Sequence, residues 1–239
     1  MNIKKKFVFI ILISVFLVLA AAALVSPVFE IQEIQVVGNS QLSNDEIFEI
    51  GEINGVGENI FMFNSGSVKS KLKANNYIKS VRVTKKLPST IVINIEERRV
   101  RGYVPYMGSY LYIDIDGRVI DVRDDMTVQH PVVLGLKFEG FTLGEVLTVT
   151  NGYSLSYVVQ ISKLIDAYDL SDITVKLDVS DPEDIHLFVN KIDVNFGNID
   201  DAYTKIATLN EVLKQLDPEE TGTLDISDIN NNPSFKLLT

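Results

Sequence analysis

The sequence predicts an α+β protein in which a single N-terminal transmembrane helix precedes two exported domains. An apolar run over residues 7–25 predicts the helix, and residues 26–98 then follow a β-α-α-β-β pattern. Residues 99–239 combine many short strand patterns with two amphipathic helices, which is typical of a mixed, strand-dominated domain. Residues 1–6 are expected to be a cytoplasmic stub.

The apolar run is interrupted only by Ser14, and it reaches the length of about 20 residues that crosses a bilayer. Lys4, Lys5 and Lys6 precede it, and the first acidic residue is Glu30. Because positive flanks stay in the cytoplasm, the N-terminus is expected inside the cell membrane and the domains outside it. The alternative is a cleaved signal peptide. A retained anchor is favoured because signal cores usually span only about 7–15 residues.

The net charge and the lack of cysteine limit which partners and which kind of fold the sequence is compatible with. The chain has 22 Lys and Arg against 32 Asp and Glu, a net charge of −10, and the stub removes three of those lysines from the exported part. An acidic surface of this kind argues against nucleic acid and against adhesion to an anionic membrane face. Cysteine is absent, so an exported fold must depend on packed apolar cores instead of disulfides.

The first domain begins with strand-forming residues 29–37, which stop at the turn pair Gly38-Asn39. Ser43 and Glu46 have the spacing of a capping box and predict a short helix that ends at Gly51. Asn64 is placed to cap a second helix, in which Val68 and Leu72 share one face.

Two strands close the first domain. Residues 77–85 and 90–96 alternate apolar and polar side chains on either side of the turn Leu87-Pro88-Ser89. This alternation predicts a hairpin with one solvated face.

The second domain is predicted to be built around strands, with Asp116-Gly117 as a tight turn between two of them. Asp114 and Asp116 are expected to serve that turn and not a metal. The strands are expected at residues 100–106, 110–115, 119–120, 132–134, 174–179, 185–189, 192–196, 223–227 and 234–238, and the helices at 151–168 and 200–216.

Nothing in the sequence assembles a catalytic or cofactor site. Nucleophilic catalysis needs a cysteine, or a serine or threonine beside a base, and the only histidines are His130 and His186. Two histidines so far apart have no zinc-site spacing. We therefore expect no enzyme, no cofactor, no metal and no small-molecule substrate.

Residues 217–228 have the ligand spacing of an EF-hand calcium loop, with glycine at the sixth position. The twelfth position is Asp228 instead of glutamate, and residues 229–233 cannot continue as a helix. A helix-to-strand turn is the favoured interpretation.

Several stretches of the first domain resemble the POTRA module of the bacterial division proteins FtsQ and DivIB. They are Val36-Val37-Gly38-Asn39, Asn59-Ile60-Phe61, residues 72–79 and residues 81–98. The last of these stretches contains a strand, a basic pair, a proline turn, a second strand and Glu97-Arg98. The second domain is similar, more weakly, to the β-domain that follows POTRA in that family.

The resemblance implies a non-catalytic, single-pass scaffold of the division machinery, concentrated at the division septum. Its partners would be an FtsB- or DivIC-like protein and an FtsL-like protein. A C-terminal strand at a sheet edge can receive a partner's strand. The residues expected to bind the partner there are Ile226, Ser227, Asp228, Ile229 and Phe235.

The alternative is an exported ligand- or calcium-binding surface protein in which the POTRA-like unit is only a folding module. The two hypotheses differ over what the C-terminal strands bind.

Overall fold

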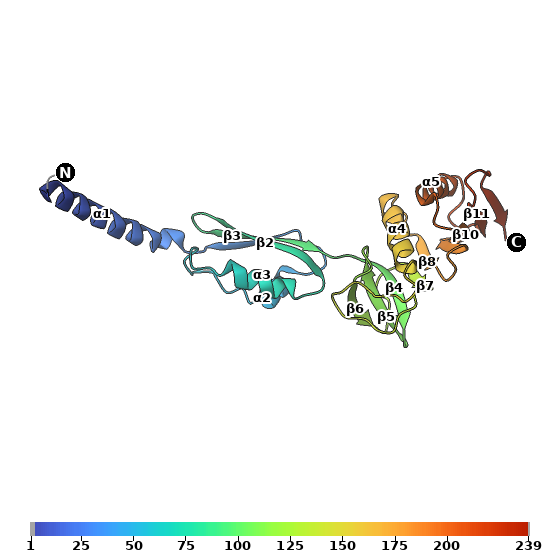
Figure 1. Ribbon diagram of the computed structural model, residues 1–239, viewed down its shortest axis with the longest axis horizontal. Helices are drawn as coiled ribbons and strands as arrows, with labels where there is room; N and C mark the ends of the chain where they lie inside the picture. Colours follow the sequence, from blue (N-terminus) through green and yellow to red (C-terminus); the bar gives the residue numbers. More distant parts are fainter. Residues whose placement is uncertain (1–2, 239) are drawn as a thin grey trace. The chain divides into compact units, whose positions relative to one another are not determined.

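The structure is a computed structural model that describes residues 3–238, and within the N-terminal helix it describes the side chains of residues 7–18 and 24. The chain divides into a first unit that ends at Glu97 and a second that begins at Arg98 (Figure 1). Each has its own buried apolar cluster.

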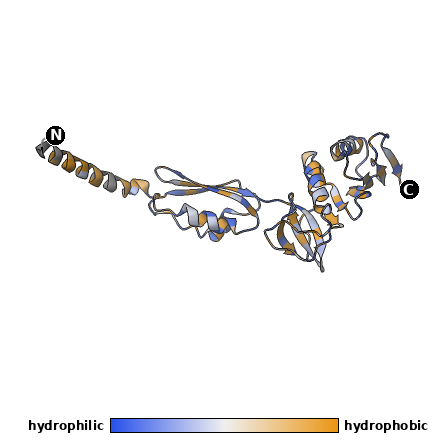
Figure 2. Cartoon of the chain, in the orientation of Figure 1, coloured by the Kyte–Doolittle hydropathy of each residue, from blue (hydrophilic) through white to orange (hydrophobic). Residues whose placement is uncertain are grey.

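The N-terminal helix α1 spans Ile3–Leu24. Phe7, Val8, Phe9 and Ile10 are successive residues, and each is between 55% and 66% exposed. Successive residues point about 100° apart, so these four apolar side chains lie on different sides of the helix. The coloured part of α1 in Figure 2 is mostly hydrophobic. When only described residues are counted, none of the helices combines the length and the apolar character that crossing a membrane requires. The span expected over residues 7–25 is therefore not confirmed here.

The first unit contains a sheet of β1 (Glu33–Val37), β3 (Thr90–Glu97) and β2 (Ile78–Lys86), in that spatial order. The central β3 pairs in parallel with β1 and antiparallel with β2. Parallel neighbours need a crossover, and α2 (Asn44–Gly51) and α3 (Ser65–Lys73) supply it on one face of the sheet (Figure 1). The predicted α+β class and the β-α-α-β-β order of this unit are confirmed.

Helices α2 and α3 both begin at side-chain caps. The Ser43 hydroxyl accepts from the Glu46 N–H at 3.2 Å, and the Glu46 carboxylate accepts from the Ser43 N–H at 2.8 Å. The Asn64 carbonyl accepts from the Ser67 N–H at 3.0 Å. The predicted capping box and the second cap are therefore confirmed, and Val68 and Leu72 are buried together as expected.

The first strand starts later than the sequence indicates, at Glu33 and not at residue 29. Ser26 caps a short 3-10 turn, η1 (Pro27–Phe29), in which proline occupies the first turn. Beyond it, the Ile31 N–H donates to the Glu58 carbonyl at 2.8 Å, away from β3. The prediction of strand over residues 29–32 was wrong because Ile31 pairs with the loop at Glu58 and Gln32 pairs with Ser89 in the turn before β3.

The carboxylate of Glu97 holds the turn after β1 against the end of β3. It accepts hydrogen bonds from the Ser40 N–H and hydroxyl, both at 2.9 Å, from the Gln41 N–H at 2.7 Å and from the Leu42 N–H at 3.0 Å. Partial burial raises the pKa of Glu97, but these hydrogen bonds outweigh it and hold the pKa below its ordinary value of 4.5. The same turn needs Gly38, whose φ is +91°.

In the second unit, nine strands form one sheet over the described residues 98–238, in the spatial order β12-β11-β10-β9-β8-β7-β4-β5-β6. The strands are β4 (Val100–Tyr106), β5 (Ser109–Asp114), β6 (Val119–Arg123), β7 (Val132–Leu134), β8 (Thr174–Asp178), β9 (Ile185–Val189), β10 (Lys191–Gly197), β11 (Thr221–Asp225) and β12 (Ser234–Leu237). The helices α4 (Ser154–Ala167) and α5 (Ala202–Leu213) pack on it through buried apolar residues.

Asp114 closes the turn between β5 and β6, as the sequence predicted. Its carboxylate accepts from the N–H groups of Asp116 and Arg118, both at 2.9 Å, and forms an ion pair with Arg98 at 2.9 Å. Glu97 and Arg98 are thus consecutive residues whose side chains serve different units.

Replacing Glu97 by glutamine should lower the free energy of unfolding of the first unit by about 1–3 kcal/mol at pH 7, because an ionised acceptor is lost. A lowered pKa means that this contribution is fully present above pH 4.5 and is lost as the pH falls through the folded-state pKa. Chemical unfolding and hydrogen exchange of residues 38–43 measure both effects.

Glu96→Gln is the matched control, because Glu96 is exposed and pairs with Lys79 at the surface. Its cost should stay below about 1 kcal/mol. Equal losses in the two variants would contradict the role given to Glu97.

Candidate functional site

The C-terminal edge lies at one of the two sides of the large sheet, the other being β6, and we define it as β12 together with the loop 226–233. Among the described residues, β12 pairs with β11 alone, and β11 in turn pairs in parallel with β10. The other long side of β12 therefore has no strand of this chain beside it in the region that the structure describes.

The hydrogen-bond register decides which backbone groups face outward. The Leu238 N–H donates to the Thr221 carbonyl at 2.9 Å, which makes these residues a hydrogen-bonded pair. Such pairs alternate along antiparallel strands, so Phe235 and Leu237 direct their backbone N–H and C=O away from β11. Unpaired groups in a row are a template for an added strand.

Two of the predicted site residues belong to the core. Ile226 is 4% exposed, and its N–H donates to the Asn195 carbonyl at 3.0 Å. Phe235 is half-buried and packs against the large apolar cluster. Its ring lies over Gly222, where a Cβ would come within 2.7 Å of the ring and 2.6 Å of the Lys236 carbonyl oxygen.

Two more predicted residues shape the loop of the C-terminal edge. The Ser227 N–H and hydroxyl donate to the Asp225 carboxylate at 3.0 and 2.7 Å, which ends β11 and lowers the pKa of Asp225. Asp228 accepts from the Asn230 N–H at 2.9 Å, and its bonds to Asn230 lower its pKa. The strand expected to extend to residue 227 therefore stops at Asp225 because the Ser227 side chain turns the chain.

Only Ile229 of the predicted set is a largely exposed apolar side chain, at 43%. The structure adds Leu237 and Leu238, which are 58% and 60% exposed. Their apolar character in a final strand was visible in the sequence, but sequence alone does not show that the strand lies at an edge.

A buried lysine supports the corner beside this loop. Lys205 on α5 is 2% exposed, and its ammonium donates to the Asn198 carbonyl at 2.9 Å. Burial lowers the pKa of Lys205, while the nearby carboxylates, Asp228 among them, oppose that shift. At the same corner, Gly197 has φ +65°, and a Cβ there would lie 2.8 Å from the Ser227 Cβ.

The two histidines are held at separate places. His186 pairs with Asp193 at 2.7 Å and with Asp184 at 3.3 Å. Its partial burial lowers the pKa, but the two carboxylates outweigh that effect and raise it. His130 lies near the ring of Tyr103, and burial lowers its pKa.

The calcium-loop spacing at residues 217–228 corresponds to a helix-to-strand turn. The Asp217 carboxylate accepts from the Glu219 N–H at 2.9 Å, and residues 221–225 are paired with β10. Across the described residues, no three histidine, cysteine, aspartate or glutamate side chains are grouped to hold a metal ion.

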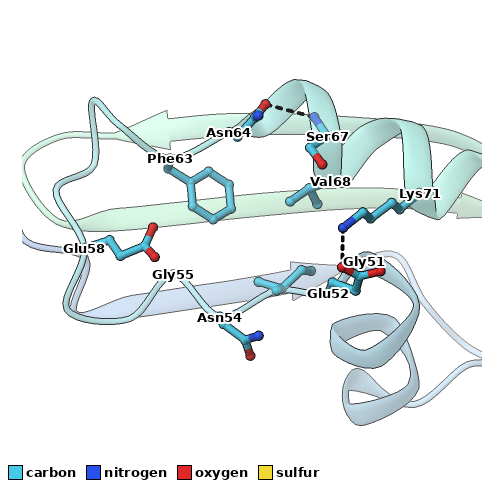
Figure 3. A pocket seen from close by; sticks show the side chains of 11 residues that line it. Gly51, Glu52, Asn54, Gly55, Glu58, Phe63, Asn64, Ser67, Val68 and Lys71 are labelled. Atoms are coloured by element: carbon cyan, nitrogen blue, oxygen red, sulfur yellow. Dashed lines mark hydrogen bonds and ion pairs between the residues drawn. The ribbon is translucent and has the colours of Figure 1, made fainter.

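The first unit contains a small pocket of about 150 Å³ between α2 and α3 (Figure 3). Phe63 and Glu58 line one side, while the ion pair of Lys71 with Glu52, at 2.5 Å, crosses the other. Its volume is below the range of about 300–1,000 Å³ that bound small molecules usually occupy.

Comparisons with known proteins agree with the fold of the first unit. Residues 29–98 match the family model described as POTRA domain, FtsQ-type. Cell division protein DivIB of Clostridium botulinum is 29% identical over 240 residues, which cover 99% of this chain and 92% of that protein. Cell division protein DivIB of Clostridium acetobutylicum is 27% identical over 224 residues, which cover 92% and 88%. Cell division protein FtsQ of Syntrophotalea carbinolica is 27% identical over 214 residues, which cover 86% and 72%.

Gly222→Ala should destabilise the second unit by about 1–3 kcal/mol, because the added methyl group collides with the Phe235 ring and the backbone of β12. Hydrogen exchange of β12 should rise together with this loss of unfolding free energy. Gly140→Ala is the control, since a Cβ there meets nothing within 4 Å. Unchanged protection of β12 in Gly222→Ala would contradict the packing described.

Proposed function

Because the chain belongs to the DivIB/FtsQ family of cell division proteins, we propose that it is a non-catalytic, single-pass membrane scaffold of the bacterial division machinery. In this proposal, residues 1–6 lie in the cytoplasm and residues 7–25 cross the cell membrane. The POTRA domain of residues 26–98 and the β-domain of residues 99–239 act outside the membrane, at the division septum.

The support for the anchor is the apolar character of residues 7–25, interrupted only by Ser14, and the exposure of the described apolar side chains of α1. A helix that is apolar all round has no polar face to turn to water while it packs on a domain, but the hydrocarbon of a bilayer can surround it on every side. The hydroxyl of Ser14 donates to the Ile10 carbonyl at 3.0 Å, so this polar group needs no outside partner.

The support for partner binding is the open side of β12. A partner strand added there would take its affinity from the outward backbone groups of Phe235 and Leu237, and its selectivity from side chains beside them. The proposed partner is the FtsB- or DivIC-like division protein, with the FtsL-like protein beside it. The exposed residues Ile229, Leu237 and Leu238 would contact the partner directly.

The other predicted site residues take supporting roles in this proposal. Ile226 anchors the loop in the core, and Ser227 and Asp228 set its path. Phe235 fixes β12 by packing on Gly222. A membrane anchor raises the effective concentration of partners anchored in the same bilayer, so modest affinity at the edge suffices for capture.

The edge proposal is tested by Leu237→Pro, which removes an outward N–H without removing a bond to β11. Leu237→Ala is the matched control, because it shortens the same side chain and keeps the N–H. Pull-down of the DivIC-like partner should be lost in Leu237→Pro and largely kept in Leu237→Ala, with the fold intact in both by circular dichroism. Capture by the proline variant would show that strand addition is wrong.

The anchor proposal predicts that the full chain resists alkaline extraction from membranes and keeps its full mass of 26.7 kDa. Ile11→Lys with Val15→Lys should make it extractable, since each central lysine costs about 2.5–3.5 kcal/mol of insertion free energy. Val37→Lys, at an exposed apolar position outside α1, should stay in the membrane. A product shortened behind the alanines at residues 20–23 would identify a cleaved signal peptide instead.

A further inference from the structure

Exposed apolar side chains of the first unit gather at the end of its sheet where α1 joins. Outside α1, the large apolar residues exposed among its described residues are Val25, Val28, Val37, Val56, Phe61, Met62 and Leu87. Val37 ends β1 and lies at the far end of the sheet. The others, which we call the tip cluster, lie in the connection after α1, in the loop after α2 and in the β2–β3 turn.

Backbone pairing holds these three segments together. The Ile60 N–H donates to the Phe29 carbonyl at 2.8 Å, and the Gln32 N–H donates to the Ser89 carbonyl at 2.9 Å. The rings of Phe29 and Phe61 are 5.1 Å apart. Hydrogen bonds and a ring contact therefore hold loops from distant parts of the sequence together, and these loops form the tip cluster.

The same surface is bonded to the end of α1. The Asn59 side-chain amide donates to the Leu24 carbonyl at 2.8 Å. The loop that carries Asn59 is also held to β2, because the Lys85 ammonium donates to the Phe61 carbonyl at 3.2 Å. Because Asn59 lies between exposed Val56 and Phe61, whatever surrounds the last turn of α1 also meets these side chains.

We propose that the tip cluster inserts into the interfacial layer of the bilayer that α1 spans, an inference that rests on the proposed membrane anchor. Apolar side chains at such an interface lie about 5–10 Å deep, at the boundary of headgroups and acyl chains. Met62, at 82%, is the most exposed member, followed by Val25 at 76% and Val56 at 67%, and these side chains would enter first. The insertion holds the first unit against the membrane surface.

The chemistry of this surface is apolar and not electrostatic. Lys85 and Lys86 are accompanied at the same end by Glu30, Glu33 and Glu58, so the cluster has no excess of positive charge. Insertion should therefore need no anionic lipid and should respond little to salt, unlike a polybasic segment.

The absence of cysteine from the chain makes a direct test possible, because a single introduced cysteine carries the only label. The full chain is reconstituted into phosphatidylcholine vesicles, with and without phosphatidylglycerol, and an environment-sensitive fluorophore is attached at Met62→Cys. Asp45→Cys, in the first turn of α2, is the exposed reference, and Val15→Cys reports on the anchor.

The Met62 label should shift its emission to the blue and be quenched by lipid-borne quenchers in both lipid mixtures and at high salt. The Asp45 label should emit as in water. Val56→Asp with Leu87→Asp should return the Met62 label to water, whereas Val37→Asp, an exposed apolar position at the far end, should leave it in lipid.

A Met62 label in water beside a Val15 label in lipid would overturn the tip insertion and leave the anchor standing. Both labels in water would overturn the anchor and the insertion together. A Met62 label that is protected only when a partner protein is added would identify the cluster as a protein-binding surface and overturn the insertion.

Discussion

Apolar burial in two separate cores is the interaction on which this structure depends, because the chain has no cysteine to cross-link either unit. Ile47, Leu72 and Ile93 are fully buried in the first core, and Phe196 and Leu209 are fully buried in the second. Burial is non-directional, so polar contacts set the geometry around each core. Glu97 fastens the turn after β1, and Asp114 with Arg98 fastens the turn after β5. The boundary between the units falls between these two consecutive residues, Glu97 and Arg98.

The proposed functions all lie on what the two cores leave uncovered. In the described part of the chain these surfaces are α1, the tip cluster and the open side of β12. Each matches a different partner for a physical reason. An all-round apolar helix suits hydrocarbon, a compact apolar cluster without an excess of positive charge suits the bilayer interface, and unpaired backbone groups suit another strand. The proposed scaffold would act by binding its partners and holding them in place, and this role requires no catalytic group.

Much of the fold was predictable because its signals are local. The capping box at Ser43 and Glu46, the cap at Asn64 and the alternation in β2 and β3 each depend on neighbours within a few residues. The predictions failed where partners from distant segments decided the outcome. Residues 29–32 have strand composition, but the Ile31 N–H pairs with Glu58 and the Gln32 N–H with Ser89, and β11 ends at Asp225 because Ser227 bonds back to it. Ile226, one of the residues expected to bind the partner, is 4% exposed and lies in the apolar core.

The sequence by itself indicated most of the helices and strands, the apolar N-terminal run and the resemblance of the first domain to a POTRA module. Hydrophobic periodicity and capping carry that information because they act between near neighbours. Only the tertiary structure decided that β12 is an edge strand, that Gly222 lies under the Phe235 ring and that loops around Val28, Phe61 and Leu87 form one surface. Alternation with a period of two residues assigns each side chain of a strand to one face of the sheet. It does not identify the neighbouring strand, so only long-range strand pairing determines which strands lie at the edges.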